Sequence, residues 1–183
     1  SDVPSFELLK AQGTVLSTRE YGDLQDLSST SFHVSFGHGH PHLKEAIKNQ
    51  LDEFPTASPK ATFELKKEVS EKLIHDLKAG DGRIFYTVSG AEAVENALKM
   101  VRSQSGKNIV AARSVSYHGA SLGALSITGD WRHQGHELLN ESTLRIPEPQ
   151  DDPDASECRA LVEKTGPQKI AAFCLETITG GNG

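Results

Sequence analysis

A short turn at residues 89–91, Ser-Gly-Ala, has the composition of a site that binds an anion. The apolar run 84–88 predicts a strand that leads into the turn, and apolar residues at helical spacing follow it. A helix that begins here presents backbone N–H groups without intrahelical partners, together with the positive end of its dipole. Gly90 lets an anion approach the backbone because it has no Cβ, and Ser89 adds a hydroxyl donor. The turn therefore predicts a phosphate-binding site.

The same residues also fit a purely structural role. Ser89 is a favourable N-cap residue and Gly90 is a common turn residue. Glu92 and Glu95 would then complement the dipole of the helix that they open. The sequence has neither a Walker A signature nor a Gly-x-Gly-x-x-Gly fingerprint. The turn alone therefore does not identify the phosphate, and a dinucleotide-binding domain is disfavoured.

The elements around this turn follow an alternating pattern. Further helices are predicted from Pro41, from Thr62 and over residues 155–165, and further strands over residues 108–112 and 169–175. Strands that alternate with helices indicate an α/β fold with a largely parallel sheet. The first 40 residues are expected to be irregular, apart from a turn that enters a strand at residues 21–27.

Composition narrows the class of protein. The 183 residues carry a formal charge of -6 and show no basic stripe, which argues against a nucleic acid as the main partner. No apolar run is long enough to cross a membrane. Cys158 and Cys174 are the only cysteines, which favours a reducing compartment and hence the cytoplasm.

Four segments resemble, in order, motifs of the class III aminotransferases, the ornithine and 4-aminobutyrate aminotransferase family. Residues 89–102 resemble its cofactor-phosphate motif, and residues 37–41, Gly-His-Gly-His-Pro, resemble its N-terminal Gly-His-x-His-Pro loop. Residues 116–119, Ser-Tyr-His-Gly, resemble the aromatic-His-Gly segment under the cofactor ring. Residues 175–183 resemble the family's Glu-Pro-x-x-Gly-x-x-Gly segment.

The resemblance implies a fold and an activity. Residues 61–183 would form the first part of a fold type I large domain, with α/β/α layers and a mostly parallel sheet. Residues 1–60 would contribute to the small domain and the interface of a homodimer. The activity implied is pyridoxal phosphate (PLP)-dependent transfer of an amino group from an amino donor to a 2-oxo acid. A PLP-dependent racemase, aminomutase, decarboxylase or lyase of the family, or a non-catalytic fragment, remains an alternative.

The resemblance also assigns roles to residues at the phosphate turn. Backbone donors at Gly90 and Ala91, next to Ser89, would hold the cofactor phosphate. Ala91 departs from the family, where Ser or Thr is frequent, so one hydroxyl is lost while the N–H remains. The phosphate site is therefore expected to persist in a weaker form.

Two further segments would surround the cofactor ring. Tyr117 would stack on the pyridine ring, and His118 would orient its loop by hydrogen bonding. Glu176 would lie near the phenolic edge of the cofactor and pair with an arginine that sorts substrates. Thr177 replaces the family's Pro, which puts the shape of that loop in question. Each side chain also fits a plain structural or solvated role.

We expect neither a metal site nor the reactive lysine of the family within this chain. His38, His40 and His42 have no nearby cysteine or carboxylate partner in the sequence, so we expect a structured loop rather than a metal site. The family's Schiff-base lysine and the acidic partner of its pyridinium nitrogen follow the Glu176 region. We therefore expect the lysine beyond Gly183, no catalytic residue within these 183 residues, and no transamination by this chain alone.

Overall fold

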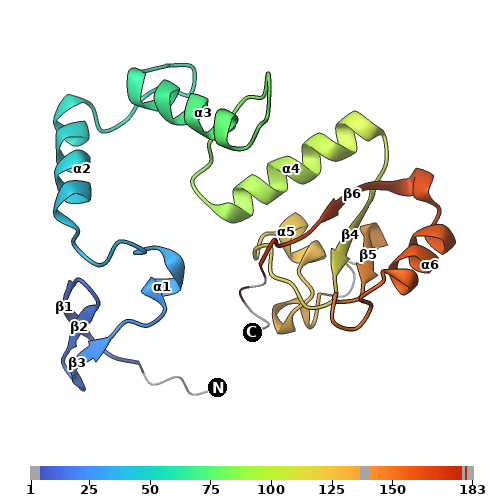
Figure 1. The fold of residues 1–183 in the computed structure, drawn as a ribbon, viewed down its shortest axis with the longest axis horizontal. Coiled ribbons are helices and arrows are strands. Elements are labelled where there is room, and N and C mark those ends of the chain that lie inside the picture. Colours follow the sequence, from blue (N-terminus) through green and yellow to red (C-terminus); the bar gives the residue numbers. More distant parts are fainter. Residues whose placement is uncertain (1–4, 137–140, 179, 181–183) are drawn as a thin grey trace. The chain divides into compact units, whose positions relative to one another are not determined.

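The computed structural model describes residues 5–136, 141–178 and 180. The chain divides into two compact units, Ser1–Glu68 and Val69–Gly183, and each is described by itself. The order of elements can be followed in Figure 1. Within the described residues, no helix is both long and apolar enough to cross a lipid bilayer.

The first unit begins with a small antiparallel sheet, of which the sequence predicts only the strand within residues 21–27. Its strands pair in the order β1-β2-β3 and are followed by two helices. The bounds are β1 (Leu8–Gln12), β2 (Val15–Thr18), β3 (Gly22–Gln25), α1 (Ser29–Phe32) and α2 (Pro41–Glu53). The strand expected within residues 21–27 is confirmed as β3. The expectation that the preceding residues are irregular is wrong, because strands as short and exposed as β1 and β2 carry little apolar alternation.

Two predicted helices are confirmed. Helix α2 begins at Pro41, whose missing N–H costs nothing in the first helical turn. It ends where Phe54 turns extended (φ -166°, ψ 129°), as expected for a residue that precedes a proline. Helix α3 (Glu64–Asp76) begins two residues after Thr62.

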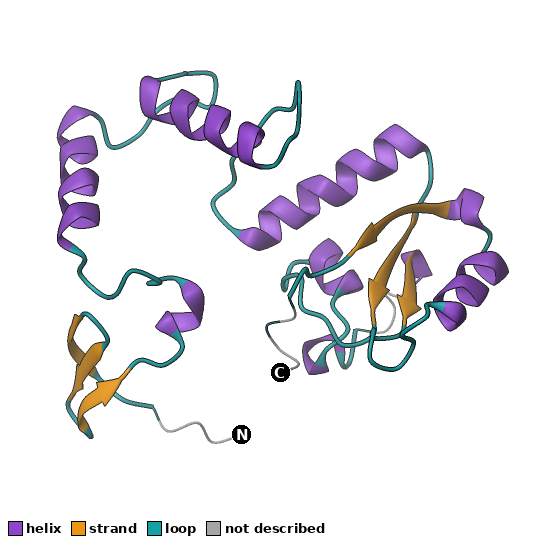
Figure 2. Cartoon of the chain, viewed as in Figure 1, coloured by secondary structure: helices purple, strands orange, loops and turns teal. Residues whose placement is uncertain are grey.

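The second unit contains the predicted parallel sheet, in the order β5-β4-β6 (Figure 2). Helix α4 packs against α5 and β6, while α6 packs against β5. The bounds are α4 (Gly90–Ser105), β4 (Ile109–Arg113), α5 (Leu122–Ile127), the 3-10 helix η1 (Trp131–His133), β5 (Thr143–Ile146), α6 (Ser156–Thr165), the 3-10 helix η3 (Pro167–Lys169) and β6 (Ile170–Cys174).

The core of this unit lies where α4 and α5 meet the central strand. Val110 and Ala112 of β4 are fully buried, and Ile127 of α5 packs against them. Leu98 supplies the contact from α4, with Val94 one turn earlier beside it. The apolar face of α4 is therefore fixed against the sheet, which also fixes the N-terminus of that helix.

One predicted strand is not formed. Residues 84–88 have no strand partner among the described residues, and Phe85, Tyr86 and Val88 are 63%, 45% and 96% exposed. β-Branched and aromatic residues favour a strand, but a strand needs a neighbour for its N–H and C=O groups. Without that neighbour the segment is a connection into α4 without regular secondary structure.

A loop of the first unit is tied to the hairpin turn. Gly13 and His38 exchange two backbone hydrogen bonds of 2.9 and 2.7 Å. Gly37 has a φ of +86°, and a Cβ there would lie 3.2 Å from the carbonyl oxygen of Gly13. The side chain of His38 contacts Asp26, with Nε2 2.8 Å from Oδ2, and both side chains are nearly buried.

The Asp26 carboxylate makes the stability of this unit depend on pH. The hydrogen bond with His38, and then N–H groups that include those of Thr30 and Ser28, lower the pKa of Asp26. An acid with a lowered pKa adds stability above its unfolded pKa of about 4, and this stability is lost as the pH falls below that value. Asp26→Asn should therefore destabilise the protein at neutral pH and make the loss of stability between about pH 5 and pH 3 shallower.

Urea unfolding across that pH range, followed by a probe in the first unit, measures both effects. Asp52→Asn is the matched control, because Asp52 is exposed on α2 and makes the same change of charge. Parallel pH profiles for the wild type and Asp26→Asn would contradict the prediction.

Candidate functional site

The N-terminus of α4 presents open backbone donors. Ser89 is the N-cap, with extended backbone, and its Oγ accepts a 3.1 Å hydrogen bond from the Glu92 N–H. No described residue accepts a hydrogen bond from the N–H of Gly90 or Ala91. A Cβ added to Gly90 would meet nothing within 4 Å. Two N–H groups and the free Ser89 O–H therefore face an open space at the positive end of a 16-residue helix.

The structural role considered for this turn is also real. Ser89 caps the helix, and the Glu92 carboxylate accepts a hydrogen bond from the Val88 N–H at 3.1 Å. The capping uses different atoms from the open donors. Capping and anion binding can therefore coexist at this turn.

The sequence predicts that Glu95 complements the dipole of its own helix, but its carboxylate contacts a different helix. Its carboxylate accepts hydrogen bonds from Gly123 N–H at 2.7 Å and Ala124 N–H at 3.3 Å, at the beginning of α5. Burial raises the pKa of Glu95, but hydrogen bonds from Ser121, Gly123 and Ala124 outweigh it and leave the pKa lowered. The ionised side chain thus joins α4 to α5.

The Tyr117-His118-Gly119 loop lies against the phosphate turn. A Cβ on Gly119 would be 2.9 Å from Cβ of Ala91 and 2.8 Å from Cβ of Ala124, and its φ is +134°. Only glycine satisfies both the spacing and the backbone conformation. This close approach brings together two segments that the sequence singles out separately.

Thr128 holds the Tyr117-His118-Gly119 loop by side-chain hydrogen bonds. It is fully buried, and its Oγ1 accepts the N–H of His118 at 3.0 Å. The hydroxyl lies 3.1 Å from the Gly119 carbonyl oxygen and 2.9 Å from that of Ala124, so it can donate to either. The backbone N–H of His118 thus ties the loop to a fully buried side chain.

Glu176 follows the end of β6 and holds the loop by its carboxylate. Oε1 accepts the N–H of Tyr117 at 2.8 Å, and Oε2 accepts the N–H of Gly180 at 3.1 Å. Its carbonyl oxygen accepts a 2.8 Å hydrogen bond from Nη2 of Arg113. The side chain is half-buried rather than free in solvent, which excludes the plain solvated role.

A buried ion pair supports this arrangement and is not recognised in the sequence. Arg113 and Glu148 have side chains 10% and 4% exposed, with Nε 3.7 Å from Oε2. Glu148 also accepts the N–H of Val115 at 2.8 Å. The available signal is an arginine that directly ends the apolar strand β4, but its partner lies 35 residues away in the sequence.

The ring of His118 lies in a half-buried position with one nitrogen unused. Nδ1 is 3.6 Å from Sγ of Cys174, while Nε2 is buried without a hydrogen-bond partner among the described residues. Burial lowers the pKa of His118; the Arg113 and Arg145 charges act in the same direction and Glu176 opposes them. Burial thus favours the neutral form of the ring, and a buried polar atom without a partner suits a group supplied from elsewhere.

The predicted cofactor residues accordingly fall into one neighbourhood of the second unit. The Ser89, Gly90 and Ala91 turn touches the loop that carries Tyr117 and His118, and Glu176 holds that loop. No group of three or more metal-ligating side chains occurs in the described parts of the chain. The ring of His40 packs edge-on against Phe36, with centroids 6.2 Å apart.

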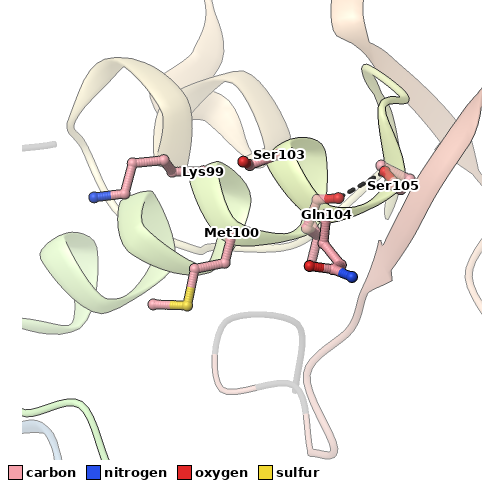
Figure 3. A pocket seen from close by; sticks show the side chains of 7 residues that line it. Lys99, Met100, Ser103, Gln104 and Ser105 are labelled. Carbon is pink, nitrogen blue, oxygen red and sulfur yellow. Dashed lines mark hydrogen bonds between the residues drawn. The ribbon is translucent and has the colours of Figure 1, made fainter.

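A separate groove lies on the C-terminal half of α4. Its volume is about 710 Å³, and Figure 3 shows Lys99 and Met100 among the residues that line it. Nζ of Lys99 donates to Oδ1 of Asn96 at 2.9 Å. None of the predicted site residues lines this groove, so it does not belong to the candidate site.

Glu176→Gln tests the role of the carboxylate. Glutamine keeps the size but replaces one acceptor oxygen with an NH₂ donor, which leaves the N–H of Tyr117 or Gly180 without an acceptor. We expect hydrogen exchange at one of these amides to accelerate about tenfold or more, because hydrogen bonds to charged groups contribute about 1.5–3 kcal/mol. Glu157→Gln on exposed α6 is the control, and unchanged protection at both amides would contradict the assignment.

Comparison with known proteins gives this geometry a context. A family model described as aminotransferase class-III matches residues 1–183. The acetylornithine aminotransferase of Bacillus cereus is 32% identical over 180 residues, which cover 98% of this chain and 44% of that protein. Aminotransferase PigE of a Serratia species is 32% identical over 177 residues, which cover 95% of this chain and 20% of that protein. The chain thus spans less than half the length of these relatives.

Solved structures agree with the sequence relatives. The taurine:2-oxoglutarate aminotransferase from Bifidobacterium kashiwanohense, solved in complex with PLP and glutamate, has a TM-score of 0.88 and 30% identity. The match covers 98% of this chain and 44% of that one. An S-selective transaminase from Bacillus megaterium has the same fold, with a TM-score of 0.85 at 23% identity. The α/β unit with its parallel sheet is therefore an incomplete fold type I domain, and the chain belongs to the class III aminotransferase family.

Proposed function

We propose that the complete protein is a PLP-dependent aminotransferase that moves an amino group from an amino donor to a 2-oxo acid. The observation that carries this proposal is the open N-terminus of α4 beside the Tyr117 loop. The N–H groups of Gly90 and Ala91 have no partner in the described chain, and Gly119 holds the loop against Ala91.

The residues present fit this cofactor. Unpaired N–H groups at a helix N-terminus suit its phosphate. Tyr117 is 46% exposed, and its aromatic side chain suits stacking on a flat aromatic ring. The buried Nε2 of His118 without a partner leaves a polar position for a group outside the described chain. Bound PLP supplies an electron sink at the carbon that carries the amine.

The residues of this chain bind and orient rather than react. Gly90 and Ala91 would donate to the phosphate, Ser89 would add its hydroxyl, and Tyr117 would present a ring face. Glu176 follows the end of β6 and accepts a hydrogen bond from the backbone N–H of Tyr117. We place the lysine that attaches the cofactor beyond Gly183, so the 183-residue chain alone is expected to be inactive.

The relatives suggest the class of amino donor. One solved structure is named for taurine and 2-oxoglutarate, and curated relatives are named for acetylornithine and diaminobutyrate. These named donors support an ω-amino acid or amine for this protein. Analysis of products with an ω-amino donor would separate amino transfer from racemisation, amino migration or elimination.

Membership of the family also supports a proposal for the organisation of the complete protein. Residues 1–60 would belong to the small domain and a homodimer interface, and residues 61–183 to the large domain. Exposed apolar side chains in the first unit support an interface, because Leu27, Phe32 and Phe36 are 95%, 78% and 76% exposed. The free thiols of Cys158 and Cys174 support the cytoplasm as the location.

Gly90→Ala tests the phosphate turn. A Cβ at this position meets no atom of the chain within 4 Å, so thermal unfolding of the apo-protein should not change. The same Cβ would occupy the space that the phosphate needs, and we expect PLP to bind about tenfold more weakly. Ala91→Ser adds a hydroxyl donor at the turn and should strengthen binding about threefold.

The measurement is the dissociation constant of PLP for the complete apo-protein, with transfer from taurine or β-alanine to 2-oxoglutarate followed as glutamate formed. Wild-type protein that neither binds PLP nor forms glutamate from any ω-amino donor would contradict the proposed function. Equal PLP affinity in the wild type and in Gly90→Ala would show that the phosphate does not bind at this turn.

A further inference from the structure

Arg132 occupies a position that the aminotransferase motifs do not explain. Its guanidinium carbon lies 4.6 Å from the centroid of the Tyr117 ring and 4.7 Å from the centroid of the Trp131 ring. Both distances are within the range at which a cation is attracted to an aromatic face. One face of the Tyr117 ring is therefore covered by a planar cation.

The segment that carries Arg132 is fixed to the loop of Tyr117. The N–H groups of Gly129 and Asp130 lie 2.8 and 3.3 Å from the carbonyl oxygen of Ser116. A Cβ on Gly129 would be 2.3 Å from the carbonyl oxygen of Ser114, so the backbones are in direct contact. The position of Arg132 relative to Tyr117 is thus set by backbone contacts.

Asp130 orients the guanidinium. Its carboxylate accepts the backbone N–H of Arg132 at 2.9 Å and forms an ion pair with Nη1 of the same residue. The side chains are 14% and 42% exposed, so Asp130 is the better-buried partner. The pair brings a planar group to the Tyr117 ring with its charge balanced.

The contact with Arg132 matters because the side chain of Tyr117 is not held by Glu176. The residue is 46% exposed, and Glu176 accepts a hydrogen bond only from its backbone N–H. An exposed tyrosine samples several rotamers. The population of rotamers that cannot stack on a ligand lowers the affinity of the protein for that ligand. A guanidinium against one face restrains the ring without covering the opposite face.

We propose that Arg132 is a positioning residue for the cofactor: it holds the Tyr117 ring from one face so that the other face receives the PLP ring. This inference rests on the proposed function. It adds Arg132 and Asp130 to the site as a support that acts through Tyr117.

The test is the dissociation constant of PLP for the complete apo-protein, together with the visible circular dichroism of the bound cofactor. Arg132→Ala should weaken binding about threefold to tenfold and reduce the dichroism. Arg132→Lys keeps the charge but lacks the planar group, so it should remain impaired. In a Tyr117→Ala background, Arg132→Ala should have no further effect, because its partner is gone.

Arg159→Ala, on the exposed surface of α6, is the matched control and should bind PLP as the wild type does. Tighter binding by Arg132→Ala would mean that the guanidinium occupies the face needed by the cofactor, and would overturn the inference. Full rescue by lysine, or an equal effect in both backgrounds, would also overturn it. Wild-type protein that binds no PLP would defeat the proposed function itself, whereas unchanged binding in Arg132→Ala defeats this inference alone.

Discussion

The candidate site depends on the hydrogen bonds that the carboxylate of Glu176 accepts. It accepts one N–H from the Tyr117 loop and one from Gly180, so a single side chain at the end of β6 connects two loops. Two N–H donors suit an ionised carboxylate, whose oxygens are acceptors only. The Gly119–Ala91 approach then carries this fixed loop onto the N-terminus of α4. The site therefore depends on the sheet and on two loops that are distant in sequence.

Much of the second unit could be predicted because its signals are local. Helical spacing after Gly90 and the apolar strand that precedes Glu176 each act over a few residues, and both elements form as predicted. The site residues could be grouped because the carboxyl ends of parallel strands meet at one edge of the sheet. The phosphate turn itself was ambiguous, and the structure shows that its capping atoms and its open donors are distinct.

What could not be predicted depends on contacts between distant residues. Residues 84–88 have strand composition, yet no described strand lies beside them to complete a hydrogen-bond ladder. Glu95 serves the helix α5 instead of its own, and Arg113 meets Glu148 only after the sheet has formed. The stacking of Arg132 on Tyr117 likewise requires the backbone contact at Gly129. Spacing along the chain does not encode such pairs.

A crystal structure of the complete protein with PLP would test the central claim most directly. The account predicts phosphate oxygens within hydrogen-bonding distance of the N–H groups of Gly90 and Ala91, at about 2.7–3.2 Å, and the cofactor ring stacked on Tyr117. It would be contradicted by a phosphate bound away from the N-terminus of α4, or by a Tyr117 ring that makes no contact with the cofactor.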